Sequence, residues 1–341
     1  MTDRLRIFNR SGFLLAEFSV SVSRSYVLGA RSTASFEVAT NQTYCTDNVL
    51  NFFNWVVVES TNKPDWVGLI SSRVWGKSTV TITALTPEFL LSKRIGDKET
   101  LIQGSAGMIF SEIIRQVNRD DVTILKVGEV YIGADMEETI DPTSLDRDLK
   151  RIFERSKEEY LWRPGFDSAG KLSVYGDWVK QAGVDKNFTL WQASGGGNIE
   201  LNDRTLVEDA PDGNYIYGYG NGITWDAKPI AISTDTTSRN KYGLIQKSVS
   251  YYGLKTIDAI QKNADAELLL SKDSANVYNV KAIDNGDTFA NLALGNVLNL
   301  NLTNVGFLSG VLGTIIKVRI IGMMYDPDNG EKIDLALYKK D

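Results

Sequence analysis

Over about the first 90 residues, apolar and polar residues alternate in short runs separated by turn-forming residues. In "TASFEVA", Ala34, Phe36 and Val38 alternate with polar side chains, which is the period of a strand with one buried face. The run "TVTITAL" has the same alternation and follows the turn Trp75-Gly76-Lys77. This spacing predicts an all-β barrel or sandwich, with a hairpin around that turn and the three apolar residues facing the core.

Beyond about residue 91 the apolar spacing becomes helical. One helix is predicted between a capping Ser105 and a stop at Asn118, and another from Asp141-Pro142, a capping residue followed by proline. The apolar positions of the two helices are Ala106, Ile109, Ile113, Ile114 and Val117, then Leu145, Leu149, Ile152 and Phe153. Short strand candidates lie between and after them, so we expect a middle α/β region of about 100 residues.

The β pattern returns after "QASGGGNIELNDR", which we interpret as a linker because consecutive glycines favour no regular element. An aromatic strand, "NYIYGYGNG", and a helix near 256–270 follow. The predicted inward positions are Ile257, Ile260, Ala264 and Leu268 of the helix, then Leu298, Leu300 and Leu302 of a later strand. A closing hairpin is predicted around the turn "DPDNG".

The chain is therefore predicted to be mainly β with α/β parts, an α+β protein in three regions. We expect a first β domain at 1–94, a middle α/β domain at 95–198, and a second β domain at 199–341 with a possible insertion. Both β regions end in a long strand, a polar turn containing glycine and an alternating strand. Any two hairpins look alike, so the pattern alone is weak evidence for a duplicated barrel.

Composition removes most catalytic chemistry. The 341 residues include no histidine and one cysteine, Cys45, which excludes Ser-His-Asp triads, Cys-His pairs, zinc sites with histidine ligands and internal disulfides. The formal net charge of -6 argues against a broad basic surface for DNA phosphate. The start "MTDRLRIFNR" lacks the apolar core of a signal peptide, and Lys317 and Arg319 interrupt the most apolar region, so we expect a soluble protein without membrane insertion.

Two motifs suggest bound ligands, and hairpin turns explain both better. "GKST" at 76–79 has Ser71 where a phosphate-binding loop needs glycine, and it leads into a strand. "DPDNGEKIDLAL" spaces Asp326 and Asp328 like calcium ligands, but Gly330 comes one place early and Leu337 replaces the final glutamate.

The acids, glycines and tryptophans give no stronger evidence for a catalytic or ligand-binding site. The pairs Glu137-Glu138 and Glu158-Glu159 are interpreted as solvated faces, because adjacent side chains point apart and cannot form a catalytic dyad. "GYGNG" and "GGG" lack the context of a dinucleotide site. The tryptophans are expected in barrel and interface cores: Trp66, Trp75, Trp162, Trp178, Trp191 and Trp225. We therefore expect no enzyme, and no catalytic, metal or cofactor-binding residues.

The order of these elements resembles that of the tail hub proteins of tailed bacteriophages, which include baseplate hubs of contractile tails and the N-terminal part of tail-associated proteins of long, non-contractile tails. The similar stretches are "GARSTASFEVATN", "VGLISSRVWGKSTVTITALTPEFLLSKRI", "GSAGMIFSEIIRQVN", "LALGNVLNLNL" and the closing hairpin. The most specific stretch is "NYIYGYGNG", then Asp235, Ser238, Tyr242 and Gly243, then the helix from Thr256. Asn296 stands where many relatives have Asp.

The resemblance implies two barrels of tail-tube type in each subunit of a homotrimer. Three subunits would form a ring with pseudo-sixfold symmetry that joins a hexameric tail tube to a threefold tip and leaves a channel for DNA. Distal tail or tail-tube proteins would bind on one side, and tip, spike or fibre proteins on the other. DNA would pass without specific binding through a virion component assembled in the host cytoplasm. Because the sequence ends just after the last barrel strand, we expect any lytic activity to need another polypeptide.

Two other functions stay open at this point. A cell-wall glycosidase could use two of the many acids, and a carbohydrate-binding β protein could use the tryptophans as stacking platforms. Absence of muralytic activity would end the first alternative, and failure to bind cells or glycans would end the second.

Overall fold

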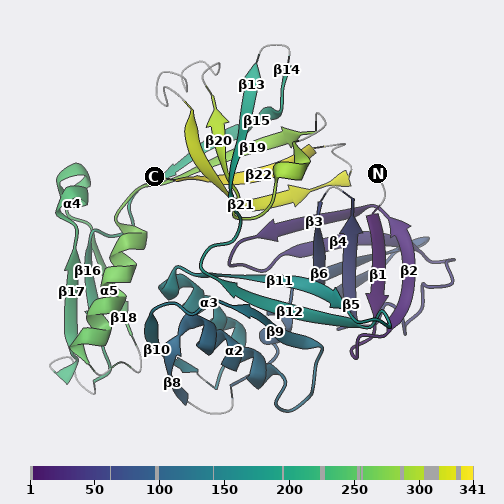
Figure 1. Ribbon diagram of the computed structural model, residues 1–341, viewed down its shortest axis with the longest axis horizontal. Helices are drawn as coiled ribbons and strands as arrows, with labels where there is room; N and C mark the ends of the chain where they lie inside the picture. Colours follow the sequence, from purple (N-terminus) through teal and green to yellow (C-terminus); the bar gives the residue numbers. More distant parts are fainter. Residues whose placement is uncertain are drawn as a thin grey trace.

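The computed structural model describes residues 3–61, 63–96, 100–140, 142–193, 196–222, 227–251, 254, 256–284, 288–302, 315–327 and 332–340. Most of these residues form strands, as Figure 1 shows. Two sets of strands share one large sheet, helices α2 and α3 lie beside them, and a small layer around α5 stands apart. Within the described residues no helix is both long and apolar enough to cross a membrane.

The first strand set curls around one hydrophobic core. Its strands are β1 (Asp3–Phe8), β2 (Leu14–Val20), β3 (Val22–Val27), β4 (Thr33–Ala39), β5 (Trp55–Ser60), β6 (Lys63–Trp75) and β7 (Thr79–Leu85). They pair in the order β2-β1-β5-β6-β7-β4-β3. One residue, Ser21, separates β2 from β3, so the chain turns from pairing with β1 to pairing with β4. The alternation was predicted correctly, because Ala34, Phe36 and Val38 are all buried in this core.

The second strand set has the same pairing order. Its strands are β13 (Asp185–Ala193), β14 (Gly196–Gly197), β15 (Ile199–Asp209), β19 (Ala275–Ile283), β20 (Val297–Asn301), β21 (Ile316–Tyr325) and β22 (Lys332–Lys339). The order β13-β20-β21-β22-β19-β15 repeats β1-β5-β6-β7-β4-β3, and β14 pairs with β13 as β2 pairs with β1. One pairing differs, since β1 is antiparallel to β5 whereas β13 is parallel to β20.

The predicted linker at 192–204 was wrong, because the chain forms strands there. Gly196 and Gly197 pair with Ala193 and Gln192, and β15 begins two residues later. The Asn198 side chain stabilises this corner by accepting from the Trp191 N–H at 2.7 Å and donating to the Thr189 carbonyl at 2.9 Å. A glycine backbone still supplies one donor and one acceptor, so neighbours can hold it in a ladder.

The middle region contains two small sheets and two main helices. Its elements are α1 (Glu88–Leu91), β8 (Thr100–Ser105), α2 (Ala106–Val117), β9 (Leu125–Val130), β10 (Asp135–Ile140), α3 (Leu145–Ser156), β11 (Glu159–Phe166) and β12 (Leu172–Val179). β10 pairs with β8, and the other sheet has the order β11-β12-β9. Helix α2 has the predicted bounds, because the Ser105 hydroxyl accepts from the Met108 N–H and Asn118 follows its last residue.

Helix α3 begins later than predicted. Its first residue is Leu145, with Ser144 at the N-cap position, whereas Pro142 lies in a bend and Asp141 lies outside the described residues. Proline fixes its own φ near the helical value, which suits a turn as well as a first helical residue. The expected inward positions Leu145, Leu149 and Ile152 are buried, and Phe153 is partly buried against the same core.

A small layer is inserted between β15 and β19. It consists of β16 (Tyr215–Tyr219), β17 (Ile230–Thr234), α4 (Thr236–Tyr242), β18 (Gln246–Ser250) and α5 (Ile257–Ser271), and a short 3₁₀ turn, η2 (Phe289–Asn291), follows β19. The strands pair in the order β17-β16-β18 and form no pairs with the large sheet. Ile260, Ala264 and Leu268 face inward as expected, whereas Ile257 at the helix start is 58% exposed, contrary to the prediction.

Some expected features lie outside the described residues. They are Gly195, Trp225, the stretch 306–314 and residues 328–330 of the turn "DPDNG". The arms of the closing hairpin are present, because β21 and β22 pair antiparallel.

Replacing Phe36 with aspartate should unfold the first strand set. Phe36 is 2% exposed, and a charge there without a partner costs several kcal/mol. Chemical denaturation followed by tryptophan fluorescence would measure the loss. The neighbouring exposed position supplies the control, since Glu37→Ala should change stability by less than about 0.5 kcal/mol. A folded Phe36→Asp variant of normal stability would show that the strand orientation is wrong.

Candidate assembly site

The two strand sets are joined through a single strand, β21. One edge of β21 pairs first with β20, through residues 316–319, and then with β3, through residues 322–325. The register with β22 shifts between Ile320 and Gly322, which marks a β-bulge at Ile321. The Ile321 carbonyl accepts from the Leu28 N–H at 3.0 Å. Because a bulge bends a strand, it redirects β21 from one partner to the next. We call the β3–β21 pairing the joint.

A buried arginine lies at the joint. The Arg24 guanidinium is 2.9 Å from the Asp3 carboxylate, and it donates to Ser60 Oγ at 2.7 Å and to the Tyr26 hydroxyl at 2.8 Å. It also lies 5.5 Å from the Tyr325 ring centroid. Burial raises the pKa of Tyr26 to about 12, so this hydroxyl stays protonated. The joint therefore combines backbone pairing with a network of side-chain contacts.

Strand β6 has a bulge like that of β21, but no described strand pairs with the corresponding edge. Its register with β7 shifts between Ile70 and Ser72, and β5 pairs with it through residues 63–69. Beyond Ile70, β7 is the one described strand that pairs with β6. Val74 and Trp75 are 63% and 54% exposed there, whereas Tyr325 at the joint is 5% exposed.

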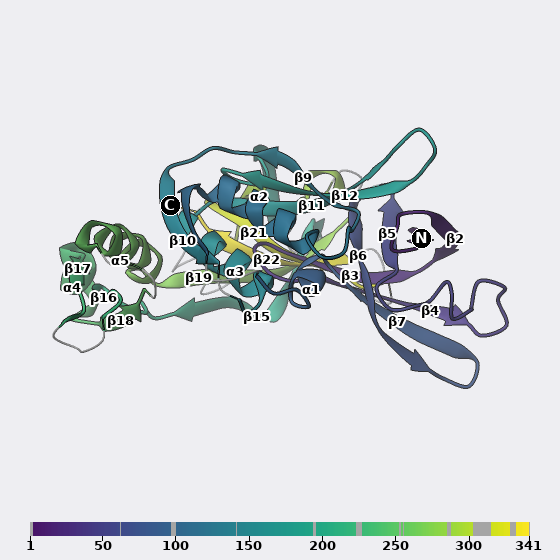
Figure 2. The ribbon, with the colours of Figure 1, turned by 90° about the horizontal axis from the view of Figure 1, so that it is seen from below.

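A second exposed edge belongs to β15. Among the described strands, residues 206–209 pair with β19 alone, and Val207 is 36% exposed. Figure 2 shows that β15 runs toward the inserted layer, whereas the hairpin of β6 and β7 extends at the other end of the molecule. Exposed strand edges are templates for pairing with another chain. Sequence reasoning missed both edges, although an apolar Val-Trp pair beside a polar turn was a signal available in the sequence.

Three of the four paired acids, Glu138, Glu158 and Glu159, are buried and do not form the solvated faces that we expected, whereas Glu137 is partly exposed. Glu159 on β11 and Arg319 on β21 are 2.7 Å apart, and the Glu159 carboxylate also accepts from the Ala182 N–H at 2.6 Å. Glu158 accepts from the Trp178 indole N–H at 2.5 Å. Glu138 forms ion pairs with Arg151 and Arg155, and its neighbour Glu137 accepts from the Gln103 amide at 2.6 Å. These bonds compensate the burial of Glu138, Glu158 and Glu159. The Glu159–Arg319 pair also fastens the middle region to the second strand set.

The other residues singled out in the sequence lie in turns, in the hydrophobic cores or at the surface. "GKST" leads into β7, and the Gly76 N–H closes the hairpin by donating to the Thr79 carbonyl at 2.8 Å. Asn296 uses both ends of its amide, accepting from the Val184 N–H at 3.0 Å and donating to the Asn291 carbonyl at 2.9 Å. An aspartate could supply the acceptor alone. Trp66 and Trp178 are buried, whereas Trp191 is 39% exposed.

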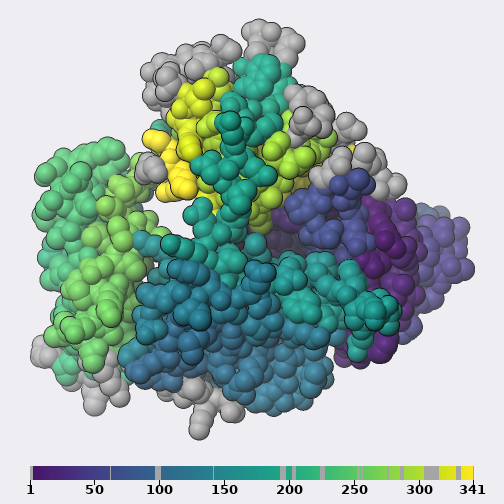
Figure 3. Space-filling view, viewed as in Figure 1, coloured from purple at the N-terminus to yellow at the C-terminus, as the bar shows by residue number. Residues whose placement is uncertain are grey.

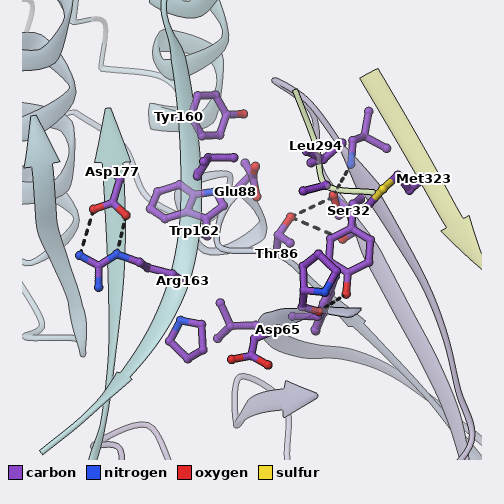
Figure 4. A pocket seen from close by; sticks show the side chains of 18 of the residues that line it. Ser32, Asp65, Thr86, Glu88, Tyr160, Trp162, Arg163, Asp177, Leu294 and Met323 are labelled. Atoms are coloured by element: carbon purple, nitrogen blue, oxygen red, sulfur yellow. Dashed lines mark hydrogen bonds and ion pairs between the residues drawn. The ribbon is translucent and has the colours of Figure 1, made fainter. Parts of the chain in front are cut away.

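A cavity of about 450 Å³ lies where the three regions meet (Figure 4). Its walls include Trp162 on β11 and Met323 on β21, and Glu88 enters it from α1. Burial raises the pKa of Glu88 above its usual range, although Thr86 and Trp162 partly counteract this. Burial and the nearby Glu88 carboxyl raise the pKa of Tyr160.

Comparisons with known proteins were made for the whole chain. No protein-family model matches it, and no curated protein matches it in sequence. Several solved structures do match. Prophage tail protein gp18 from Listeria monocytogenes EGD-e is similar over 98% of this chain and 94% of that one, with 11% identity and a TM-score of 0.60. The 43 kDa tail protein of prophage MuSo2 from Shewanella oneidensis is similar over 99% of this chain and 98% of that one, with 12% identity and a TM-score of 0.58. The chain has the fold of these tail proteins.

A third match extends the agreement. A tail protein from Neisseria meningitidis MC58 has 13% identity and a TM-score of 0.57, over 99% of this chain and 97% of that one. The similarity in each case spans nearly the full length of both chains, so the inserted layer and the middle region are included. At this level of identity the comparison shows the fold, which agrees with the phage-tail resemblance noted in the sequence.

Removing one partner of the Glu159–Arg319 pair should be strongly destabilising. Arg319→Met leaves the buried Glu159 carboxylate without its cation, which costs about 3–5 kcal/mol. Lys317→Met is the matched control on the same strand, because the Lys317–Asp185 pair is more than half exposed and is worth about 0–1 kcal/mol. Urea denaturation would measure both, and equal losses would contradict the role assigned to Arg319.

Removing the Glu88 carboxylate should stabilise the protein at neutral pH. Because its pKa is raised in the folded state, its contribution to stability is complete below the unfolded value near 4.5 and is lost as pH rises through the folded pKa. Glu88→Gln cannot ionise, so it should be more stable than the wild type at about pH 7, with a difference that shrinks toward about pH 4. Urea denaturation across this pH range would measure the free energy of unfolding of both proteins, with the exposed Glu37→Gln as control. A difference between Glu88→Gln and the wild type that does not change with pH would contradict the burial of the Glu88 carboxyl.

Proposed function

We propose that this chain is a structural hub of a phage-type tail tip or baseplate. The observation that carries the proposal is the fold shared with three tail proteins, two of them from prophages, over nearly the full length of each chain. The hub motifs of the sequence support the more specific assignment. In this role the protein is a virion component without enzymatic activity of its own, and it is assembled in the host cytoplasm.

The two strand sets are two copies of one tube-type barrel. The repeated pairing order and the bulges of β6 and β21 at corresponding places support this duplication. The domains are the first barrel at 1–94, the middle domain at 95–198 and the second barrel at 199–341. β13 and β14 precede residue 199 and add their strands to the second barrel. The layer from β16 to α5 is the insertion in that barrel.

Three copies of the chain form a ring of six barrels around a channel for DNA. The ring matches a hexameric tube on one side and a threefold tip on the other, where spike or fibre proteins bind. Closure suits barrels with exposed strand edges, because a closed ring leaves no edge free. The net charge of -6 favours the passage of DNA, since a strongly basic wall would retain it through counterion release.

Electron microscopy of the concentrated protein tests this function. End-on averages should show threefold rings with six lobes and an open centre, and sedimentation equilibrium should give the mass of three chains. A protein that stays monomeric at every concentration, with no ring in the averages, would contradict the trimeric hub.

A further inference from the structure

The joint pairs β3 of the first strand set with β21 of the second. Each of these strands has a counterpart in the opposite set, and the counterparts suggest a contact between two chains. The first correspondence follows from the hairpins. Ser72 pairs with Thr83 across the β6–β7 hairpin, and Gly322 pairs with Ala336 across the β21–β22 hairpin. In both strands this residue comes directly after the bulge. Ser72 therefore corresponds to Gly322, and three residues later Trp75 corresponds to Tyr325.

The second correspondence runs through the neighbouring strands. Ala84 pairs with Ala34, which pairs with Arg24, in the order β7, β4, β3. In the other set Leu337, the counterpart of Ala84, pairs with Tyr278, which pairs with Leu206, in the order β22, β19, β15. Arg24 on β3 thus corresponds to Leu206 on β15.

The joint has a defined register that can be transferred. Arg24, Ser25, Tyr26 and Val27 pair with Tyr325, Met324, Met323 and Gly322, respectively. Replacing each residue by its counterpart pairs Leu206, Val207, Glu208 and Asp209 with Trp75, Val74, Arg73 and Ser72. In Figure 2, β15 runs toward the inserted layer and the β6–β7 hairpin extends away from it, and the two strands do not pair within the chain that the structure describes.

We propose that residues 72–75 of β6 pair antiparallel with residues 206–209 of β15 in a second copy of this chain, in the register of the joint. The inference rests on the proposed trimeric hub and names its contact. Three joints within chains and three equivalent contacts between chains then close the ring. The contact is heterologous, as ring formation requires.

The side chains at the two edges are complementary. Trp75 meets Leu206 and Val74 meets Val207, and three of these four are among the exposed large apolar residues of the chain. Arg73 meets Glu208, a pairing of opposite charges. Arg73 already binds the exposed Asp47 at 2.7 Å and lies 4.4 Å from the Phe52 ring centroid, but its Nε has no hydrogen-bond partner among the described residues. Glu208 forms no ion pair with any residue that the structure describes.

Disulfide trapping tests the register. The Leu28 N–H donates to the carbonyl of Ile321 on the facing strand, and hydrogen-bonded and non-hydrogen-bonded pairs alternate along an antiparallel ladder. Ser25 and Met324 therefore form a non-hydrogen-bonded pair. In the transferred register, Val207 and Val74 form the same kind of pair. Cα atoms of such pairs are about 4.5 Å apart, within disulfide range. In a Cys45→Ser background, Val74→Cys with Val207→Cys should cross-link most chains into covalent trimers with diamide as oxidant. Val74→Cys with Asp209→Cys keeps the face but shifts the register by two residues, and should give less than about a tenth of that yield.

Charge exchange tests the Arg73–Glu208 contact without cysteines. Arg73→Glu and Glu208→Arg should each weaken self-association at least about tenfold by sedimentation equilibrium, because each places like charges opposite one another. The double exchange should restore association to within about threefold of the wild type. Arg115→Glu makes the same change in net charge at a 67% exposed helix position and should have no effect. Far-UV circular dichroism would confirm that every variant is folded.

The outcomes separate this contact from the proposed function. Threefold rings without cross-linking of the test pair, or with equal cross-linking of the shifted pair, overturn the contact and leave the hub intact. A cross-linked ladder that extends beyond three chains upholds the strand pairing and overturns the trimer. A wild-type chain that never associates overturns both.

Discussion

The structure depends on one backbone constraint, which is that a single edge of β21 serves two partner strands. Residues 316–319 complete the second strand set, and residues 322–325 bind β3 of the first. The bulge at Ile321 allows both, because it turns the second half of the strand away from β20. Since β3 and β21 lie at opposite ends of the sequence, the pairing that joins the two sets needs both ends of the chain.

The middle region reinforces this constraint from a second direction. The Glu159–Arg319 pair holds β11 to β21, and the ion pair between Arg31 and Asp146 at 3.0 Å holds the turn after β3 to α3. Both strands of the joint are therefore tied to the middle region, β21 through β11 and the turn after β3 through α3. The buried Arg24 adds a contact with Asp3 on the first strand, so that β1, β3 and β21 meet in one network.

Local patterns predicted local structure well and long-range structure poorly. The alternation around Phe36 and the caps of α2 depend on near neighbours, and the structure agrees with them. The joint depends on residues about 300 positions apart, and no periodicity reports such a pairing. The glycines at 196–197 were misread because their strand role comes from β13. Glu138 and Glu159 were misread because their arginines are distant or on another element.

The inserted layer has an architecture of its own. Two small hydrophobic clusters, one around Ala264 and one around Ile260, lie wholly within it. Figure 3 shows it standing beside the rest of the molecule with an opening toward the second strand set, and Arg155 reaches it through a polar bond to Asn263 at 2.9 Å. In the first set the corresponding connection is a short turn, where the Phe153 ring fills the space beside Gly29. The layer therefore packs mainly on itself, whereas an insertion at the short turn would have to displace the Phe153 ring of α3.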